Sequence, residues 1–420
     1  MSAATVTELA PSETFWTRRP VLEHLRDFAR SRRAGPWAVL CAALARADAT
    51  LGPNVMLPPT IGSSVSTNLF VALVGPSGGG KGAAEGAARD AVRFVDHNGR
   101  PIEIEEFPLG SGEGISRTFR PQGTDDEEAN PRTRALFIAP EVDTLSALGS
   151  RQGSTLMPEL RKLYMGETIG FNNANKSTRS TLPAHSYRAC LMVGVQPAKA
   201  GPLLYDSDGG TPQRFVWMPV GDPDAPDVAP STPEPLVIKA PRWGTETQFL
   251  EVPDVAREAM DRHRLATLRG EDVDPLDGHR MLTRLKVAAA LTVLDGRSIT
   301  DEEDWELAGL IMRVSDRTRA HIERTLTEKA RAANRARAQA DSERAVIVDD
   351  ARQAAEVRRV REGVIRYLTR RGRSARGDVL RSLKSDIRPH LDTVIDTLSE
   401  ESLIVTTFVS DRPFYELAST

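Results

Sequence analysis

Cysteine and aromatic residues are scarce in this chain of 420 residues, and neither positive nor negative charge predominates. Only two cysteines occur, Cys41 and Cys190, which is too few for a disulfide framework in a chain of this length, so we expect a reducing compartment. Lys and Arg number 55 against 58 Asp and Glu, and the net charge of −3 provides no global basic field for nucleic acid. Any polyanion site must therefore be local.

Long apolar runs are missing as well. No window approaches the roughly 18 uninterrupted apolar residues that indicate a membrane-spanning helix, and the N-terminus lacks a basic region followed by an apolar core. The seven histidines are scattered and show no spacing with cysteine that suits zinc. The sequence therefore predicts a cytoplasmic protein that does not span a membrane.

What is present is a series of regions that differ in pattern. In the region 67–242, short apolar or β-branched runs alternate with turn signals and helical segments, which predicts an α/β fold with a mostly parallel sheet. We expect strands at 69–74, 102–107, 135–139, 190–195 and 214–218, and a surface linker at 220–242. The predicted regions are an N-terminal helical segment (1–66), the α/β core (67–242), a helical continuation (243–325), a charged helical connector (326–357) and a C-terminal domain (358–420).

The predicted strand at 69–74 runs directly into a glycine-rich loop and a helix of small residues. The spacing from Gly75 to Lys81 fits GxxxxGK, in which backbone N–H groups converge on phosphate and the lysine reaches the terminal phosphates. Gly82 occupies the position of the Ser or Thr that usually ligates magnesium. A strand-to-helix turn without a ligand is the alternative. The predicted nucleotide-binding residues are Gly75, Pro76, Ser77, Gly78, Gly79, Gly80, Lys81, Gly82 and Ala83.

Acidic residues follow the predicted strand at 135–139, as the chemistry of phosphoryl transfer to water requires. We assign Glu141 to activation of the attacking water and Asp143 to magnesium, which it would hold through a water molecule. The alternative is that both acids only cap the next helix. Glu105 and Glu106, which we expect beyond the second strand, are the fallback acids.

Two more polar residues lie next to predicted strands, where a sensor of the γ-phosphate is expected. Gln196 follows the strand at 190–195, and its amide suits a hydrogen bond to phosphate or to the attacking water. Arg214 precedes an apolar strand, and its guanidinium suits stabilisation of transition-state charge, within one subunit or across a subunit boundary. An ordinary turn residue and a structural ion pair are the respective alternatives, and Lys199 is a weaker candidate.

Five short motifs occur in a fixed order: GPSGGGKG (75–82), LGSGEGI (109–115), ALFIAPEVD (135–143), VGVQP (193–197) and DGGTPQRF (208–215). Over roughly residues 15–325 this succession resembles the RecA-like ATPase domain of primase-helicase proteins carried by bacterial phages, plasmids and integrated elements. The resemblance implies a DNA-directed ATPase that uses ATP and Mg²⁺ and is often hexameric, with nucleotide between neighbouring subunits. On that pattern Lys81 would bind phosphate, Glu141 catalyse, Gln196 sense the γ-phosphate and Arg214 act as an arginine finger.

The C-terminal region predicts a winged helix. Three short amphipathic helices (364–368, 378–383 and 391–398) precede a β-hairpin formed by 403–409 and 414–417. Basic residues outnumber acids between 358 and 388, which suits contact with phosphate. The third helix, however, carries three acids, Asp392, Asp396 and Glu400. DNA contact and a protein-docking role therefore both stay open.

Taken together, these features predict an ATP-dependent, helicase-like motor or DNA-remodelling ATPase in replication of a mobile genetic element. Its expected partners are DNA, further copies of the chain in an oligomer such as a hexameric ring, and other replication proteins. One alternative is a DNA-binding replication initiator or regulator in which nucleotide controls assembly with little hydrolysis. A helicase loader is the other.

Overall fold

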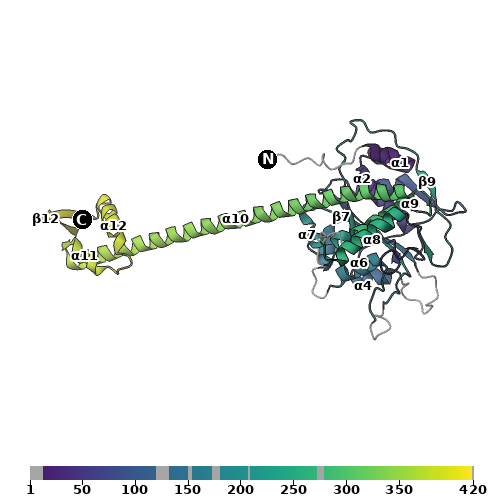
Figure 1. The fold of residues 1–420 in the computed structure, drawn as a ribbon. Helices are drawn as coiled ribbons and strands as arrows, with labels where there is room; N and C mark the ends of the chain where they lie inside the picture. The colour runs from purple at the N-terminus through teal and green to yellow at the C-terminus, as the bar shows by residue number, and fades with distance from the viewer. Residues whose placement is uncertain are drawn as a thin grey trace. The chain divides into compact units, whose positions relative to one another are not determined.

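The computed structural model describes residues 13–119, 132–149, 154–172, 180–206, 209–271 and 279–418. The chain divides into two compact units, the first ending at Lys329 and the second beginning at Ala330 (Figure 1). Each unit has its own hydrophobic core. Among the described helices, none combines the length and apolar character that crossing a membrane would require.

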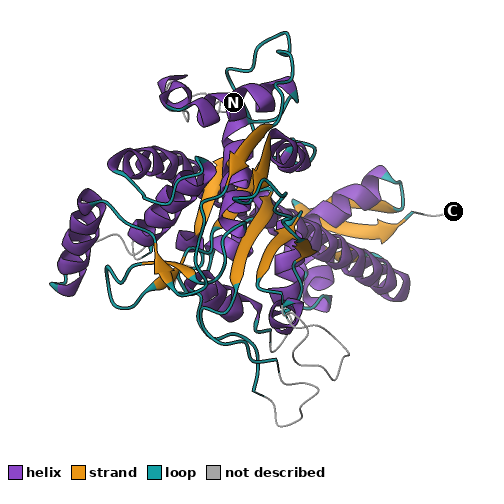
Figure 2. Cartoon of the chain, turned by 90° about the vertical axis from the view of Figure 1, so that its right-hand side faces the viewer, coloured by secondary structure: helices purple, strands orange, loops and turns teal. Residues whose placement is uncertain are grey.

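The centre of the first unit is a five-stranded sheet in which every pairing is parallel (Figure 2). Its strands lie in the order β5-β6-β7-β3-β8, so neighbours in the sheet are far apart in the chain. The predicted α/β class with a parallel sheet is thereby confirmed. The strands are β3 (Phe70–Val74), β5 (Glu106–Pro108), β6 (Arg134–Ala139), β7 (Arg188–Val195) and β8 (Phe215–Pro219).

Helices cover both faces of this sheet, because its strands are apolar on both sides. In β3, Val71 and Leu73 join one hydrophobic cluster and Phe70, Ala72 and Val74 join the other. The first cluster contains α1 (Pro20–Ser31), α2 (Pro36–Ala49), α3 (Lys81–Ala91) and α9 (Arg280–Leu294). The second contains α4 (Gly112–Thr118), α5 (Val142–Gly149), α6 (Leu156–Met165) and α7 (Gly201–Leu204).

The predicted N-terminal helical segment is part of this core. All 14 residues of α2 are buried, as expected for a helix that is apolar on every side. Two small sheets complete the unit, and one of them runs through the region predicted as a surface linker, because 236–239 form a strand there. The first small sheet joins β1 (Val55–Leu57), β2 (Val65–Ser66) and β10 (Gln248–Phe249), the second joins β4 (Val92–Val95) and β9 (Leu236–Lys239), and α8 spans Asp254–Leu268.

The predicted strand at 102–107 is largely wrong, since only Glu106 and Phe107 of that range are in a strand. The preceding residues turn back toward β4 instead, and the Ile102 N–H donates to the Phe94 carbonyl over 2.9 Å. Glu106 is the first residue of β5, where it pairs in register with Leu136 of β6. Glu105 and Glu106 thus do not follow a strand at the edge where we expected them.

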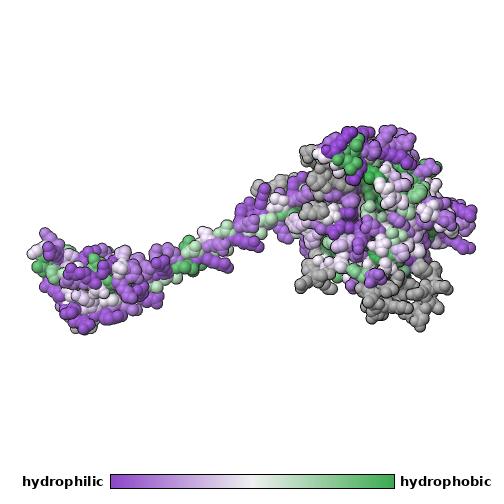
Figure 3. Space-filling model, turned by 60° about the horizontal axis from the view of Figure 1, so that its bottom comes forward, coloured by the Kyte–Doolittle hydropathy of each residue, from purple (hydrophilic) through white to green (hydrophobic). Residues whose placement is uncertain are grey.

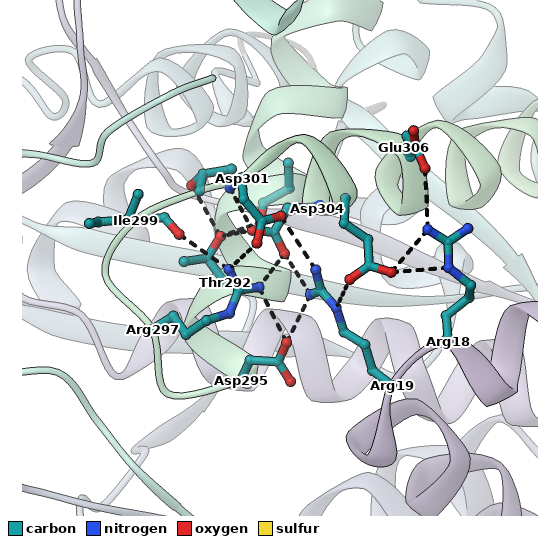
Figure 4. Close-up of polar contacts among 12 residues, drawn as sticks. Arg18, Arg19, Thr292, Asp295, Arg297, Ile299, Asp301, Asp304 and Glu306 are labelled. Carbon is teal, nitrogen blue, oxygen red and sulfur yellow. Dashed lines mark hydrogen bonds and ion pairs between the residues drawn. The ribbon is translucent and has the colours of Figure 1, made fainter. Parts of the chain in front are cut away.

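A single helix, α10 (Glu302–Arg371), passes from the first unit into the second. A buried ionic network holds its beginning, with Arg19 donating to Asp304 (2.6 Å), Asp295 (2.8 Å) and Glu303 (3.0 Å) (Figure 4). All residues from 327 to 354 are exposed, and hydrophilic side chains alternate with apolar ones on the surface of this stretch (Figure 3). The predicted charged helical connector is this exposed part of α10.

The second unit packs helices against a three-stranded antiparallel sheet of order β11-β13-β12. Its core contains Val364 and Leu368 from the end of α10 together with residues of α12 and the sheet. The predicted succession of three helices and a hairpin is present, with the first helix being the end of α10. The remaining elements are β11 (Ser374–Ala375), α11 (Arg376–Ser382), α12 (Leu391–Glu400), β12 (Ile404–Val409) and β13 (Arg412–Leu417).

Candidate phosphate-binding site

The glycine-rich loop follows the carboxyl end of β3, between β7 and β8. Its first residue is fixed to the neighbouring strand, since the Gly75 N–H donates to the Val195 carbonyl over 2.9 Å. A Cβ atom at Gly75 would lie 2.1 Å from Val220 Cγ2, so only glycine fits there. Gly80 has φ +95° and directly precedes α3, a left-handed conformation that glycine adopts without strain.

Lys81 is the first residue of α3, and its side chain folds back over the loop. Its ammonium donates to the carbonyls of Pro76 (2.9 Å) and Gly75 (3.3 Å). The chain thus places a cation against the loop, at a helix N-terminus where free N–H groups and the helix dipole attract anions. This donor set fits a phosphate group.

Gly194 lies where the site meets the ends of β6 and β7. A Cβ atom there would lie 2.0 Å from the Pro140 carbonyl oxygen and 3.3 Å from Lys81 Cδ. Only a glycine lets the turn after β6 and the stem of Lys81 approach this closely. The sequence analysis missed this residue, although a lone glycine inside an apolar strand is a recognisable signal of close approach.

Three predicted residues lie at this same carboxyl edge of the sheet. Glu141 follows β6, is exposed, and has no hydrogen-bond partner for its carboxylate among the described residues. Asp143 lies in the first turn of α5 and forms an ion pair with Lys199. Gln196 directly follows β7 and is half-buried. The structure thus brings Glu141, Asp143, Gln196 and the glycine-rich loop to one edge.

Lys199 also lies at this edge, although the sequence analysis treated it as a weaker candidate than Gln196 and Arg214. It ends a 3₁₀ turn, Pro197–Lys199, whose first hydrogen bond runs from the Lys199 N–H to the Gln196 carbonyl (2.9 Å). The hydrogen bond with Asp143 raises the pKa of Lys199, so its side chain stays charged near neutral pH. No local pattern predicts this ion pair, because its partners are 56 residues apart in the chain.

Arg214 lies at the opposite edge of the sheet. It precedes β8, whose first residue pairs with Phe70 and whose last residue pairs with Val74, so about 16 Å of strand separates it from the loop. Its side chain is buried and donates to the carbonyls of Gly210 (2.7 Å) and Gly209 (3.0 Å). The structure does not bring Arg214 together with Lys81 within one subunit, and an arginine-finger role across a subunit boundary stays a prediction.

The fallback acids are engaged in ion pairs elsewhere. Glu106 accepts hydrogen bonds from Arg89 and Arg46, and Glu105 pairs with Arg132. Burial acts to raise the pKa of Glu106, but the bonds from Arg89 and Arg46 outweigh burial and lower it. Glu105 and Glu106 therefore have structural roles in ion pairs. Among the predicted acids, Glu141 is the one whose carboxylate is open to a ligand.

The part of the chain that the structure describes holds no group of three or more His, Cys, Asp or Glu that could bind a metal ion. Searches with the sequence found no matching protein-family model and no similar curated protein. The functional argument therefore depends on the geometry of the site itself.

Proposed function

We propose that this protein is a P-loop ATPase with a RecA-like core that couples ATP hydrolysis to movement on, or remodelling of, DNA. The observation that carries the proposal is the glycine-rich loop itself. It joins the carboxyl end of β3 to the N-terminus of α3, and Lys81 lies folded over it. That combination of loop N–H groups, helix dipole and ammonium suits the β- and γ-phosphates of a nucleotide.

The topology of the sheet supports a ligand at this place. In open α/β sheets, ligands bind outside the carboxyl ends of the strands, where neighbouring strands are not consecutive in the chain. β3 and β7 are such neighbours, because β5 and β6 lie between them in sequence. Numbered by their order in the chain, the five strands are arranged 5-1-4-3-2.

The same edge supplies groups for hydrolysis. Glu141 is exposed and suits the orientation of an attacking water, and the Gln196 amide, which follows the strand next to the loop, suits a hydrogen bond to the γ-phosphate. Magnesium, when bound with the nucleotide, would neutralise phosphate charge. In this proposal Lys81 holds the phosphates, Glu141 orients water and Gln196 responds to the γ-phosphate.

We assign DNA as the partner of the second unit, in which the order of helices and hairpin resembles a winged helix. Exposed arginines without a charged partner among the described residues gather at the end of α10, namely Arg366, Arg370 and Arg371. They suit contact with the phosphate backbone. On α12, by contrast, Asp392 is engaged by Arg376 over 2.7 Å, and two further acids repel phosphate. The end of α10 is therefore the better candidate for DNA contact.

Measuring ATP binding and steady-state hydrolysis, with and without single-stranded and double-stranded DNA, tests the proposal. Lys81→Ala should abolish binding, whereas Glu141→Gln should retain binding and lose turnover by about 10²-fold or more. Lys239→Ala, which removes an exposed lysine from β9, is the matched control. Equal binding by the wild type and Lys81→Ala would refute the nucleotide site.

A replication initiator or regulator controlled by nucleotide is the second candidate. Two observations favour it: Gly82 provides no hydroxyl for magnesium, and Asp143 is already paired with Lys199. This candidate predicts ATP binding that depends on Lys81 but hydrolysis that DNA does not stimulate. DNA-stimulated turnover would exclude it.

A further inference from the structure

The donor set at the carboxyl edge fits the phosphates of a nucleotide better than it fits magnesium. P-loop proteins usually hold the ion with a hydroxyl directly after the lysine and with an acid beyond a strand. Here the first position is Gly82, and a Cβ atom there would meet nothing within 4 Å, so no neighbouring side chain fills the gap. The second, Asp143, is paired with the ammonium of Lys199.

We propose that Lys199 takes over the role of a protein-held magnesium ion. Its ammonium, which pairs with Asp143 when no nucleotide is bound, supplies the second positive charge to the terminal phosphate of the nucleotide that Lys81 binds. The inference rests on the proposed nucleotide site and assigns to it a further phosphate-binding residue. A magnesium ion that arrives with the nucleotide would then be held mainly by the nucleotide.

The position of Lys199 suits this role. Its turn begins directly after Gln196, and the strand before Gln196 is bonded to the first residue of the glycine-rich loop through Val195. The same turn is fixed from the other side, because the Lys329 ammonium donates to the Ala198 carbonyl over 2.9 Å. The backbone that carries Lys199 is therefore tied both to the loop and to α10.

The ion pair is open enough to change partners. The side chain of Lys199 is 43% exposed and that of Asp143 is 47% exposed, and an ion pair this exposed contributes little to stability. The terminal phosphate accepts the same kind of charge-assisted hydrogen bond as a carboxylate and carries more negative charge, so it can draw the ammonium away from Asp143.

The inference predicts that ATP binding depends little on magnesium. By calorimetry, the wild-type Kd in excess magnesium and in EDTA should differ by less than about threefold, whereas Lys199→Ala should weaken binding about tenfold in EDTA, the cost of one charge-assisted contact. Lys199→Arg should stay within about threefold of wild type, since it keeps the charge. Lys239→Ala is the control for removal of an exposed lysine.

Asp143→Asn separates phosphate binding from a merely structural role for the pair. If Lys199 binds phosphate, losing the competing carboxylate should tighten ATP binding in EDTA, so Lys199→Ala and Asp143→Asn shift the Kd in opposite directions. If the pair only holds the turn, both variants weaken binding. Weakening by both, or a wild-type Kd that rises tenfold or more in EDTA, would overturn the inference.

The outcome for Lys81→Ala shows which of the two proposals fails. ATP binding that is lost in Lys81→Ala but unchanged in Lys199→Ala would support the nucleotide site and contradict only the role of Lys199. No binding by the wild type, or equal binding by the wild type and Lys81→Ala, would remove both. Tryptophan fluorescence of each variant confirms that the first unit is folded.

Discussion

Replacing Arg19 with alanine should destabilise the first unit by about 3 kcal/mol, because it removes one charged partner of a buried carboxylate. The Arg19 side chain is 8% exposed and that of Asp304 is 0% exposed. In the variant, Asp304 keeps the bonds from Arg297 (2.6 Å), Thr292 (2.9 Å) and the Asp301 N–H (2.9 Å), which places the loss at the lower end of the roughly 3–5 kcal/mol seen when one partner of a buried pair is removed.

Arg18→Ala is a matched control from the adjacent position. Arg18 also pairs with acids of α10, Glu303 and Glu306, but its side chain is 41% exposed. Such exposed pairs contribute about 0–1 kcal/mol. Equal losses in the two variants, or a loss below about 1 kcal/mol for Arg19→Ala, would refute the reasoning that burial decides the strength of this network.

Urea unfolding followed by tryptophan fluorescence is the suitable assay. All five tryptophans of the chain belong to the first unit, so the signal reports on that unit alone. They are Trp16, Trp37, Trp217, Trp243 and Trp305. Unfolding of the second unit leaves this signal unchanged, which avoids the ambiguity of a protein with two units.

The same network predicts a dependence on pH. Burial acts to raise the pKa of Asp304, but hydrogen bonds from Arg297, the Asp301 N–H and Arg19 outweigh burial and lower it. A carboxyl whose pKa is lower in the folded state stabilises fully above its unfolded pKa of about 3.9, and this contribution is lost as pH falls through the folded value. The difference between wild type and Arg19→Ala should therefore be largest near neutral pH and shrink in acid.

Substitutions at three glycine or left-handed positions should change stability in predictable directions. Gly86→Ala should raise the stability of the first unit by about 1 kcal/mol in urea, because alanine favours the interior of α3 and its Cβ would meet nothing within 4 Å. Gly194→Ala should lower it by about 1–3 kcal/mol and weaken ATP binding, since its Cβ would lie 2.0 Å from a carbonyl oxygen. Asp411→Gly should stabilise the hairpin of β12 and β13 by about 1 kcal/mol, measured as slower amide exchange there, because Asp411 has φ +59°. Asp411→Ala, which keeps the Cβ, should show no such gain.

The core of the fold could be predicted because its signals are local. The runs at 69–74, 135–139, 190–195 and 214–218 each became a strand within two residues of the expected bounds. The run at 102–107 alternates apolar and acidic residues instead of being continuously apolar, and most of it found no partner strand. β9 was not predicted, because it lies in a segment rich in Pro and Asp. Its strand forms through pairing with β4, which is a tertiary contact that local sequence does not indicate.

The candidate site divides in the same way. Glu141 and Gln196 follow their strands, and parallel strands bring such residues to one edge. Arg214 precedes its strand, so the sequence already contained the reason for its place at the other edge. The ion pair of Lys199 with Asp143 and the close approach at Gly194 could not be predicted, because both depend on contacts between segments far apart in the chain.

The order of strands in the sheet has a consequence for synthesis of the protein. β3 has a neighbouring strand on each side, yet about 110 residues separate it from β7 and more follow before β8. At the usual rate of about 5–20 residues per second, β3 waits roughly 6–22 s on the ribosome without either neighbour. Its five apolar residues, all buried in the finished fold, are exposed during that time. The nascent chain must therefore shield this strand, with α2 as the nearest available cover, until translation reaches Pro219.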